Sequence, residues 1–126
     1  MADLKSEIEG RNAVFQAMFK AGKFKEAAEV YAPDCKVMLA HRNPIEGRDN
    51  AEKMLEGMWK SGSPDLSLET DEVGPSGGDF AFERGHYRLI CDDGTDKDAG
   101  KYVVVWKRVE GKLCMYLDIL NSSLPA

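Results

Sequence analysis

The sequence predicts an α+β fold in which three helices pack on one face of a curved mixed β-sheet. Apolar residues recur at helical spacing in the first half of the chain, and they alternate with polar residues after Pro64. The 126 residues contain no linker and are enough to bury one hydrophobic core. We therefore expect a single domain over residues 1–126, with its elements in the order ααβαββββ.

Two helices are predicted at the N-terminus. The first spans about five turns and is followed by Gly22, which readily adopts the left-handed conformation after a helix. A second, shorter helix over residues 24–31 ends where Pro33 forbids its continuation, and residues 35–40 form a short strand. The apolar face of the first helix consists of Leu4, Ile8, Phe15, Met18 and Phe19, and that of the second consists of Phe24, Ala27, Ala28 and Tyr31.

A third helix is predicted within residues 46–62. Asp49 and Glu52 are spaced as in a capped N-terminus, and Gly62 ends the helix. The apolar face of this helix consists of Ala51, Met54, Leu55, Met58 and Trp59.

The stretch FAFERGHYRLIC, which begins at Phe80, is predicted to be a strand with one irregularity. Phe80 and Phe82 are in phase with each other, whereas Tyr87 and Leu89 have the opposite parity. A β-bulge near Gly85 would return these side chains to one face and would bend the strand, as a curved sheet requires.

The last predicted strand, LCMYLDILN, contains Asp118 among apolar residues, and the turn before it decides what lies opposite this carboxylate. A two-residue turn would place Val103 opposite Asp118. A three-residue loop that ends at Gly111 would place Tyr102 there instead. Because a two-residue type I′ turn prefers Asn or Asp before Gly, and this chain has Glu110, the three-residue loop is favoured.

This register makes both faces of the last hairpin apolar. The inner face then carries Tyr102, Val104, Trp106, Cys114, Tyr116, Asp118 and Leu120. Since three helices can cover one face only, we expect the other to be buried against a second copy of the chain, although a different partner would also satisfy it. The predicted homodimer surface consists of Val103, Val105, Leu113, Met115, Leu117 and Ile119.

Composition and charge exclude several classes of function. The net charge is −5 and the Lys and Arg residues form no basic stripe, so no nucleic acid partner is expected. No secretory signal and no stretch of about 20 apolar residues is present, which predicts a cytoplasmic protein without membrane association. Cys35, Cys91 and Cys114 are widely spaced among apolar residues, which favours reduced thiols, and the sequence predicts neither a metal site nor a cofactor.

Five stretches in succession carry a resemblance to a known family: FKAGKFKEAAEVYAPDCKVML, PIEGRDNAEKML, FAFERGHYRL, GKYVVVWKRVEGKL and LDILNSS. The chain resembles the SnoaL-like branch of the nuclear transport factor 2-like superfamily, which has a cystatin-like α+β fold. It is also similar to ketosteroid isomerase-like proteins and to the association domains of calcium/calmodulin-dependent kinase type II. The resemblance implies a cone-shaped fold, with a strongly bent mixed sheet wrapped around a long N-terminal helix. It further implies a pocket at one end and dimerisation through the outer face of the sheet.

The activities of these relatives carry over only in part. Similar isomerases place a general-base Asp near the end of the first strand, where this chain has Met38, Leu39 and Ala40. They also use a Tyr on the first helix, where the inward residues here are Phe15, Met18 and Phe19. The association domains carry a pocket Arg that aligns with Val104, so an acidic ligand would lose its anchor. Asp118 and Asn121 fit the D-x-x-N ending of the family.

We therefore expect a homodimer with a largely apolar pocket that binds a small hydrophobic molecule. Asp118 is the candidate catalytic residue, because desolvation would raise its pKa toward the range of a general acid or base. Two alternatives remain open: a dimerisation or association domain with a residual cavity and a structural Asp118, or an isomerase, cyclase or dehydratase. The candidate pocket residues are Tyr102, Val104, Tyr87, Tyr116, Trp59, Met58, His41 and Leu120.

Overall fold

The computed structural model describes residues 3–75 and 77–125. The three helices of this part are α1 (Leu4–Lys20), α2 (Phe24–Ala28) and α3 (Arg48–Lys60). The strands are β1 (Tyr31–Met38), β2 (Ile45–Glu46), β3 (Asp65–Gly74), β4 (Phe80–Ile90), β5 (Asp96–Val109) and β6 (Lys112–Ser122). The order matches the expected ααβαββββ except for β2, a two-residue strand too short to leave a pattern in the sequence.

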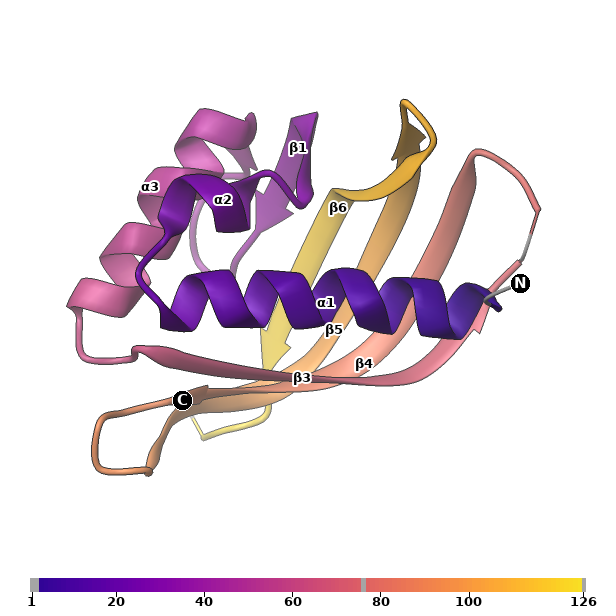
Figure 1. Ribbon diagram of the computed structural model, residues 1–126. Coiled ribbons are helices and arrows are strands. Elements are labelled where there is room, and N and C mark those ends of the chain that lie inside the picture. Colours follow the sequence, from indigo (N-terminus) through magenta and orange to yellow (C-terminus); the bar gives the residue numbers. More distant parts are fainter. Residues whose placement is uncertain (1–2, 76, 126) are drawn as a thin grey trace.

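The strands form one mixed sheet in the order β2-β1-β6-β5-β4-β3. β1 runs parallel to β6, and the other neighbours are antiparallel. Figure 1 shows the long strands bending around α1, while α2 and α3 lie beside α1 at the end of the sheet that holds β1. This arrangement confirms the expected α+β cone. None of the helices in the two described ranges is both long and apolar enough to cross a membrane.

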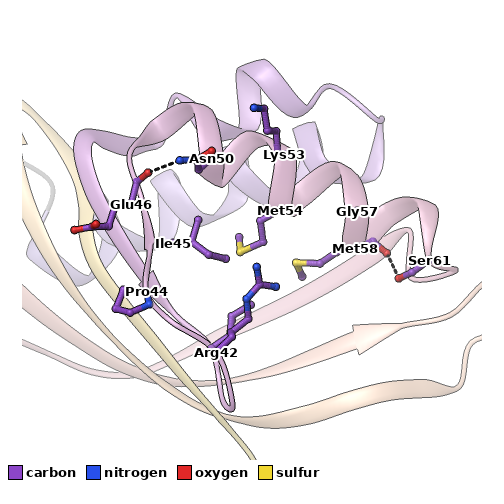
Figure 2. Close-up of a pocket in the computed structure, with 11 residues that line it drawn as sticks. Arg42, Pro44, Ile45, Glu46, Asn50, Lys53, Met54, Gly57, Met58 and Ser61 are labelled. Carbon is purple, nitrogen blue, oxygen red and sulfur yellow. Dashed lines mark hydrogen bonds between the residues drawn. The ribbon is translucent and has the colours of Figure 1, made fainter.

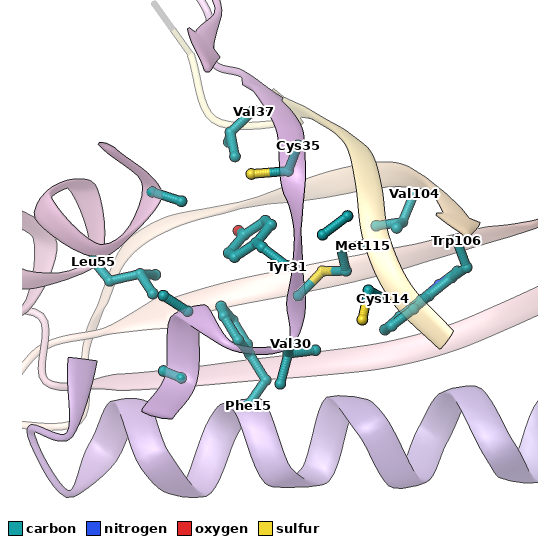
Figure 3. Close-up of a cluster of buried hydrophobic side chains, with 14 of the residues drawn as sticks. Phe15, Val30, Tyr31, Cys35, Val37, Leu55, Val104, Trp106, Cys114 and Met115 are labelled. Carbon is teal, nitrogen blue, oxygen red and sulfur yellow. The ribbon is translucent and has the colours of Figure 1, made fainter. Parts of the chain in front are cut away.

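The first helix follows its sequence signals closely. The Asp3 side chain caps it by accepting a hydrogen bond from the Ser6 backbone N–H at 2.7 Å. Its inner face buries Ile8, Phe15 and Phe19 among residues from the other layers, as Figure 3 shows for Phe15. Burial of this face holds the helix inside the cone.

The region after α1 differs from the expectation in two places. The second helix ends at Ala28, so Tyr31 begins β1 instead of lying on a helix face. The third helix is preceded by Gly47, whose φ of +87° is unfavourable for other residues, and Asp49 makes no cap hydrogen bond. Helical spacing alone could not show that the backbone enters β1 within three residues of α2.

The expected bulge near Gly85 is wrong, because β4 alternates without interruption across this residue. Phe80 and Phe82 consequently point away from the core and are exposed, whereas Tyr87 is buried. The bulge lies on the neighbouring strand, where Asp71 is the extra residue between two register pairs with β4. Gly85 is required for another reason: a Cβ atom there would lie 2.5 Å from the Tyr102 hydroxyl.

The β5–β6 hairpin also corrects the expected register. Glu110 and Gly111 form a two-residue turn, both with positive φ, and Val109 pairs with Lys112. The pairing then shifts by one residue where Tyr116 forms a bulge on β6. As a result Val104 lies opposite Asp118, instead of Tyr102 or Val103.

The bulge redistributes the side chains of β6 between the two faces. Leu113 and Met115, expected on the outer face, are buried in the core, as Figure 3 shows for Met115. Tyr116, expected on the inner face, packs instead against Phe80 and the ammonium groups of two lysines. Strands β4, β5 and β6 nevertheless leave paired apolar residues on the outer face, namely Phe82, Val105 and Leu117 in one row and Val103 and Ile119 in the next.

Candidate functional site

A small cavity of about 40 Å³ lies inside the cone, between α1, α3 and the concave face of the sheet. Its lining is apolar except for four side chains, those of Asn12, Tyr31, Tyr102 and Asp118. A cavity of this volume can hold ordered water, whereas sites for metabolites are typically about 300–1,000 Å³. Side chains must therefore move before a larger molecule can enter.

Asp118 is the one carboxyl group that lines this cavity in the described part of the chain. It is 7% exposed, and the Tyr31 hydroxyl donates a hydrogen bond to its Oδ2 atom at 3.0 Å. Across residues 3–75 and 77–125, no second donor to this side chain is present. Burial raises the pKa of Asp118 to about 7; the hydrogen bond from Tyr31 opposes this rise, and the charge of Glu83 adds to it.

Tyr31 reaches Asp118 because β1 is anchored at its start. Two nitrogens of the Arg48 guanidinium donate to the Tyr31 carbonyl oxygen, at 3.0 and 2.7 Å. The Tyr31 ring packs edge-on against Phe15 on α1, with the ring centroids 5.6 Å apart. Burial, together with the charge of Asp118, raises the pKa of the Tyr31 hydroxyl well above its usual value. Tyr31 therefore stays protonated and acts as a fixed hydrogen-bond donor.

Glu83 is a second buried carboxylate that the sequence interpretation missed. Its surroundings differ from those of Asp118 because it is completely buried and accepts four hydrogen bonds. The donors are Asn12 Nδ2, Thr70 Oγ1, Tyr102 Oη and Trp106 Nε1, at 3.0, 2.8, 2.5 and 3.1 Å. These bonds join α1, β3, β4 and β5, so Glu83 is a structural centre of the sheet.

Several predicted pocket residues do meet at the cavity. Tyr102, Val104, Met58 and Leu120 all line it. The Tyr102 hydroxyl, however, donates to Glu83, so the expected pairing of Tyr102 with Asp118 is absent. The place beside Asp118 is taken by Tyr31, which the sequence interpretation had assigned to a helix.

Tyr87 lies in a neighbouring hollow of about 260 Å³ that shares Met58 and Leu120 with the cavity. Its hydroxyl donates to Asp98 at 2.8 Å. Burial raises the pKa of Tyr87, and the hydrogen bond to Asp98 adds to this rise. The Tyr87 hydroxyl is therefore engaged with Asp98 instead of facing Asp118.

Three other predicted site residues lie away from the cavity. Trp59 packs edge-on against Phe24 and donates to the Lys20 carbonyl oxygen at 3.4 Å. Tyr116 is on the outer side of the sheet, and His41 is exposed in the segment between β1 and β2 with a φ of +66°. Helical or strand parity alone could not reveal these positions, because a bulge moved Tyr116 and the direction of the loop set His41.

A larger cleft of about 650 Å³ opens beside the cavity, between α3 and the segment that joins β1 to β2 (Figure 2). Leu39, Met54 and Met58 line both the cleft and the cavity. These three side chains therefore form the boundary between an open cleft and the buried Asp118. Leu39 had been assigned only to the end of the first strand, so its place on this boundary was not anticipated.

Known proteins with the same architecture share little sequence with this chain. A ketosteroid isomerase-like protein from Erwinia carotovora atroseptica superimposes with a TM-score of 0.77 and 17% identity, covering 95% of this chain and 96% of that one. A domain with a cystatin-like fold from Nostoc punctiforme gives a TM-score of 0.81 and 13% identity, over 96% and 78% of the two chains.

A nuclear transport factor 2-like protein from Shewanella oneidensis gives a TM-score of 0.74 and 13% identity, over 92% and 97% of the two chains. No protein with a curated description matches the sequence significantly. The family model described as the SnoaL-like domain matches residues 12–116, which is most of the chain. The chain therefore belongs to the SnoaL-like domain family.

Proposed function

We propose that this protein binds a small, largely apolar molecule inside the cone, with Asp118 as the main polar contact. The observation that carries the proposal is the contrast between the two buried carboxylates. Glu83 is saturated by four protein donors, whereas Asp118 faces the cavity with Tyr31 as its one donor in the described chain. A buried carboxyl group with spare hydrogen-bonding capacity is costly for folding, which supports a role in binding.

Ligand entry requires the boundary side chains to move, since the cavity is only about 40 Å³. Met54 and Met58 are suited to this movement, because unbranched thioether side chains change rotamer easily and adapt to different shapes. The cleft of about 650 Å³ on the far side of Leu39 supplies the necessary space. A bound molecule would thus occupy the cavity together with part of the cleft.

A second candidate function is proton-transfer catalysis of the isomerase, cyclase or dehydratase type. The specific observation in its favour is the pKa of Asp118 of about 7, which suits a group that gives and takes protons near neutrality. The likeness to a ketosteroid isomerase-like protein points the same way. At the end of β1, where similar isomerases have a base, Met38 and Leu39 stand in this chain, so Asp118 would have to act without a second carboxylate there.

The proposal includes a homodimer formed through the outer face of the sheet. Phe82, Val103 and Ile119 are 39%, 40% and 47% exposed, and they lie on three adjacent strands of that face. Grouped apolar exposure of this kind is typical of a protein–protein interface. If the cavity never admits a ligand, dimerisation would be the principal role of the domain, with the cavity as a residual feature.

The test is a titration with indole, followed by NMR of methionine methyl groups. Met115 lines the cavity but not the cleft, so its methyl signal reports occupancy beside Asp118, whereas Met18 lines neither. At about pH 8, above the Asp118 pKa of about 7, we expect indole to shift the Met115 signal. We also expect Asp118→Asn to weaken binding roughly threefold or more, because a neutral amide accepts the indole N–H less strongly than a carboxylate. Indene, which lacks the N–H group, is the matched control and should bind both proteins equally.

Two outcomes would contradict the binding proposal. One is an unchanged Met115 signal at saturating indole, and the other is identical indole affinity in the wild type and the Asp118→Asn variant. An unchanged Met115 signal would favour the dimerisation role. Identical affinities would mean that the cavity binds its ligand without a contribution from Asp118, which would then be structural.

A further inference from the structure

We propose that the ligand of the cavity is an organic acid, an apolar molecule with one anionic group, and that Arg42 binds this group in the outer cleft. The inference rests on the proposed small-molecule function and adds the chemical class of the ligand. It depends on three observations: the position of Arg42, its lack of a protein partner within the described residues and the apolar boundary that the cleft shares with the cavity.

Arg42 is exposed to solvent, but its side chain also lines the cleft. It lines the cleft together with Met54 and Met58. Figure 2 shows its side chain directed from the loop toward α3, with the guanidinium close to the two thioether side chains. The same view shows Lys53 and the carboxylate of Glu46 directed away from this guanidinium. Arg42 is therefore the charged group that faces the apolar floor of the cleft.

Arg42 also differs from the other five arginines of the chain in its pairing. Three of these, Arg84, Arg88 and Arg108, donate to the carboxylates of Glu72, Asp96 and Glu7. The remaining two, Arg11 and Arg48, donate to backbone carbonyl oxygens. Within residues 3–75 and 77–125, the Arg42 side chain has neither an ion pair nor a hydrogen bond. Its bidentate donor geometry is thus available for an external carboxylate or a similar anion.

Only a layer of apolar side chains separates the cleft that holds Arg42 from the cavity that holds Asp118. Their shared residues, Leu39, Met54 and Met58, are all apolar. A molecule that displaces these side chains would place its apolar body between them, a hydrogen-bonding group near Asp118 and its anionic end at Arg42. This order of groups describes an amphipathic organic acid, in which the anion stays in the wetter, open part of the site.

The experiment compares octanoate with octanol, which share an apolar chain and differ in the anionic group. Binding is measured at neutral pH from the methyl signals of methionine-labelled protein. Met54 and Met58 report the cleft and the cavity, whereas Met18 lines neither. We expect octanoate to bind the wild type about tenfold more tightly than octanol, which corresponds to about 1.4 kcal/mol. Added salt should weaken octanoate binding and leave octanol binding unchanged.

Two variants assign this preference to Arg42. Arg42→Gln keeps a long polar side chain but removes the charge, and we expect it to reduce the octanoate preference to nearly one while octanol binds as before. Lys112→Gln is the matched control, because Lys112 is exposed in the last hairpin and lines neither the cleft nor the cavity. This control should retain the full preference.

The outcomes separate this inference from the proposed function. Equal binding of octanoate and octanol to the wild type would overturn the role of Arg42 while leaving the apolar pocket in place. Equal losses for both compounds in Arg42→Gln would do the same, since a purely apolar contribution of the side chain would explain them. If neither compound shifts the signals of Met54, Met58 or Met115, the pocket itself is refuted, and the inference with it.

Discussion

Asp118 and Glu83 lie in the same inner row of the sheet, separated by Val104, but their surroundings give them opposite properties. Four donors stabilise the charge of Glu83, whereas burial with one donor works against the charge of Asp118. Strand position alone therefore does not determine what a buried carboxyl group does. The number of protein hydrogen-bond donors that contact the carboxyl group decides whether it is structural or available to a ligand.

We expect Asp118→Asn to stabilise the protein in a pH-dependent manner. The wild-type carboxyl group has a folded-state pKa of about 7, above its ordinary value of 3.8, so it binds its proton more tightly in the folded state. This tighter proton binding stabilises the folded state fully below about pH 4. The stabilisation, on the order of 4 kcal/mol in the free energy of unfolding, is lost as the pH rises through about 7. Asn avoids this loss. Urea unfolding at about pH 5 and about pH 8 should show a larger gain at the higher pH.

Glu83→Gln is the matched control for this effect, and we expect the opposite sign. The substitution removes the charge that four donors stabilise and places an amide N–H₂ group among them, which costs roughly 3 kcal/mol or more in the free energy of unfolding. A stabilising Glu83→Gln variant, or an Asp118→Asn gain that is the same at both pH values, would contradict the distinction between the two carboxylates.

In the β5–β6 hairpin, the pairing of two long strands outweighs the conformational preference of a turn residue. Glu110 has a φ of +51°, a conformation that costs a residue with a Cβ atom roughly 1 kcal/mol or more. The long ladder between β5 and β6 and the buried inner row outweigh this cost and select the two-residue turn. The bulge at Tyr116 then restores the inward direction of Asp118.

Glu110→Asn should therefore stabilise the hairpin, by about 0.5–1 kcal/mol, because Asn tolerates the left-handed region better than Glu. Thermal unfolding of the variant checks the sign. Gly111→Ala is the contrasting substitution and should destabilise by a similar or larger amount, since Gly111 has a φ of +84°. A loss of stability in Glu110→Asn would mean that the Glu110 side chain makes a contribution that turn geometry does not explain.

The elements of the fold could be predicted from periodicity, but the candidate site could be predicted only in part. Helix α1 and the strands after Pro64 bury long, regular patterns, and such patterns survive local irregularities. The polar contacts of the site depend on shifts of one residue in strand register or helix length, and such shifts leave no clear pattern in the sequence. Helical spacing places Tyr31 on a helix, whereas α2 ends at Ala28. A bulge at Gly85 would turn Glu83 away from the core, whereas the regular alternation of β4 buries it.

In the whole molecule, the helices lie on the concave side of the sheet. On the convex side, Phe80, Phe82, Val103 and Ile119 are exposed apolar residues. The paired row of Phe82, Val105 and Leu117 continues into the row of Arg84, Val103 and Ile119. Direct cross-strand neighbours project from the same face, so these side chains form one continuous surface. A second copy with the same surface would cover it symmetrically.

We expect the protein to be a dimer in solution and Val103→Glu to make it monomeric. A carboxylate at this position would be desolvated in a sheet-to-sheet interface, whereas in the monomer it would lie beside Arg84, its neighbour across the strand pair. The variant should therefore keep its fold while losing its partner. Light scattering coupled to size-exclusion chromatography measures the mass directly.

Val14→Glu is the matched control, because Val14 is 44% exposed on α1, against 40% for Val103. It changes the same residue type by the same charge at nearly the same exposure, but on the helical side of the molecule. If the sheet face is the interface, Val14→Glu stays dimeric and Val103→Glu does not. A monomeric wild type, or dissociation by both substitutions alike, would show that the outer face has no partner of its own kind. The apolar rows would then need a different protein to cover them.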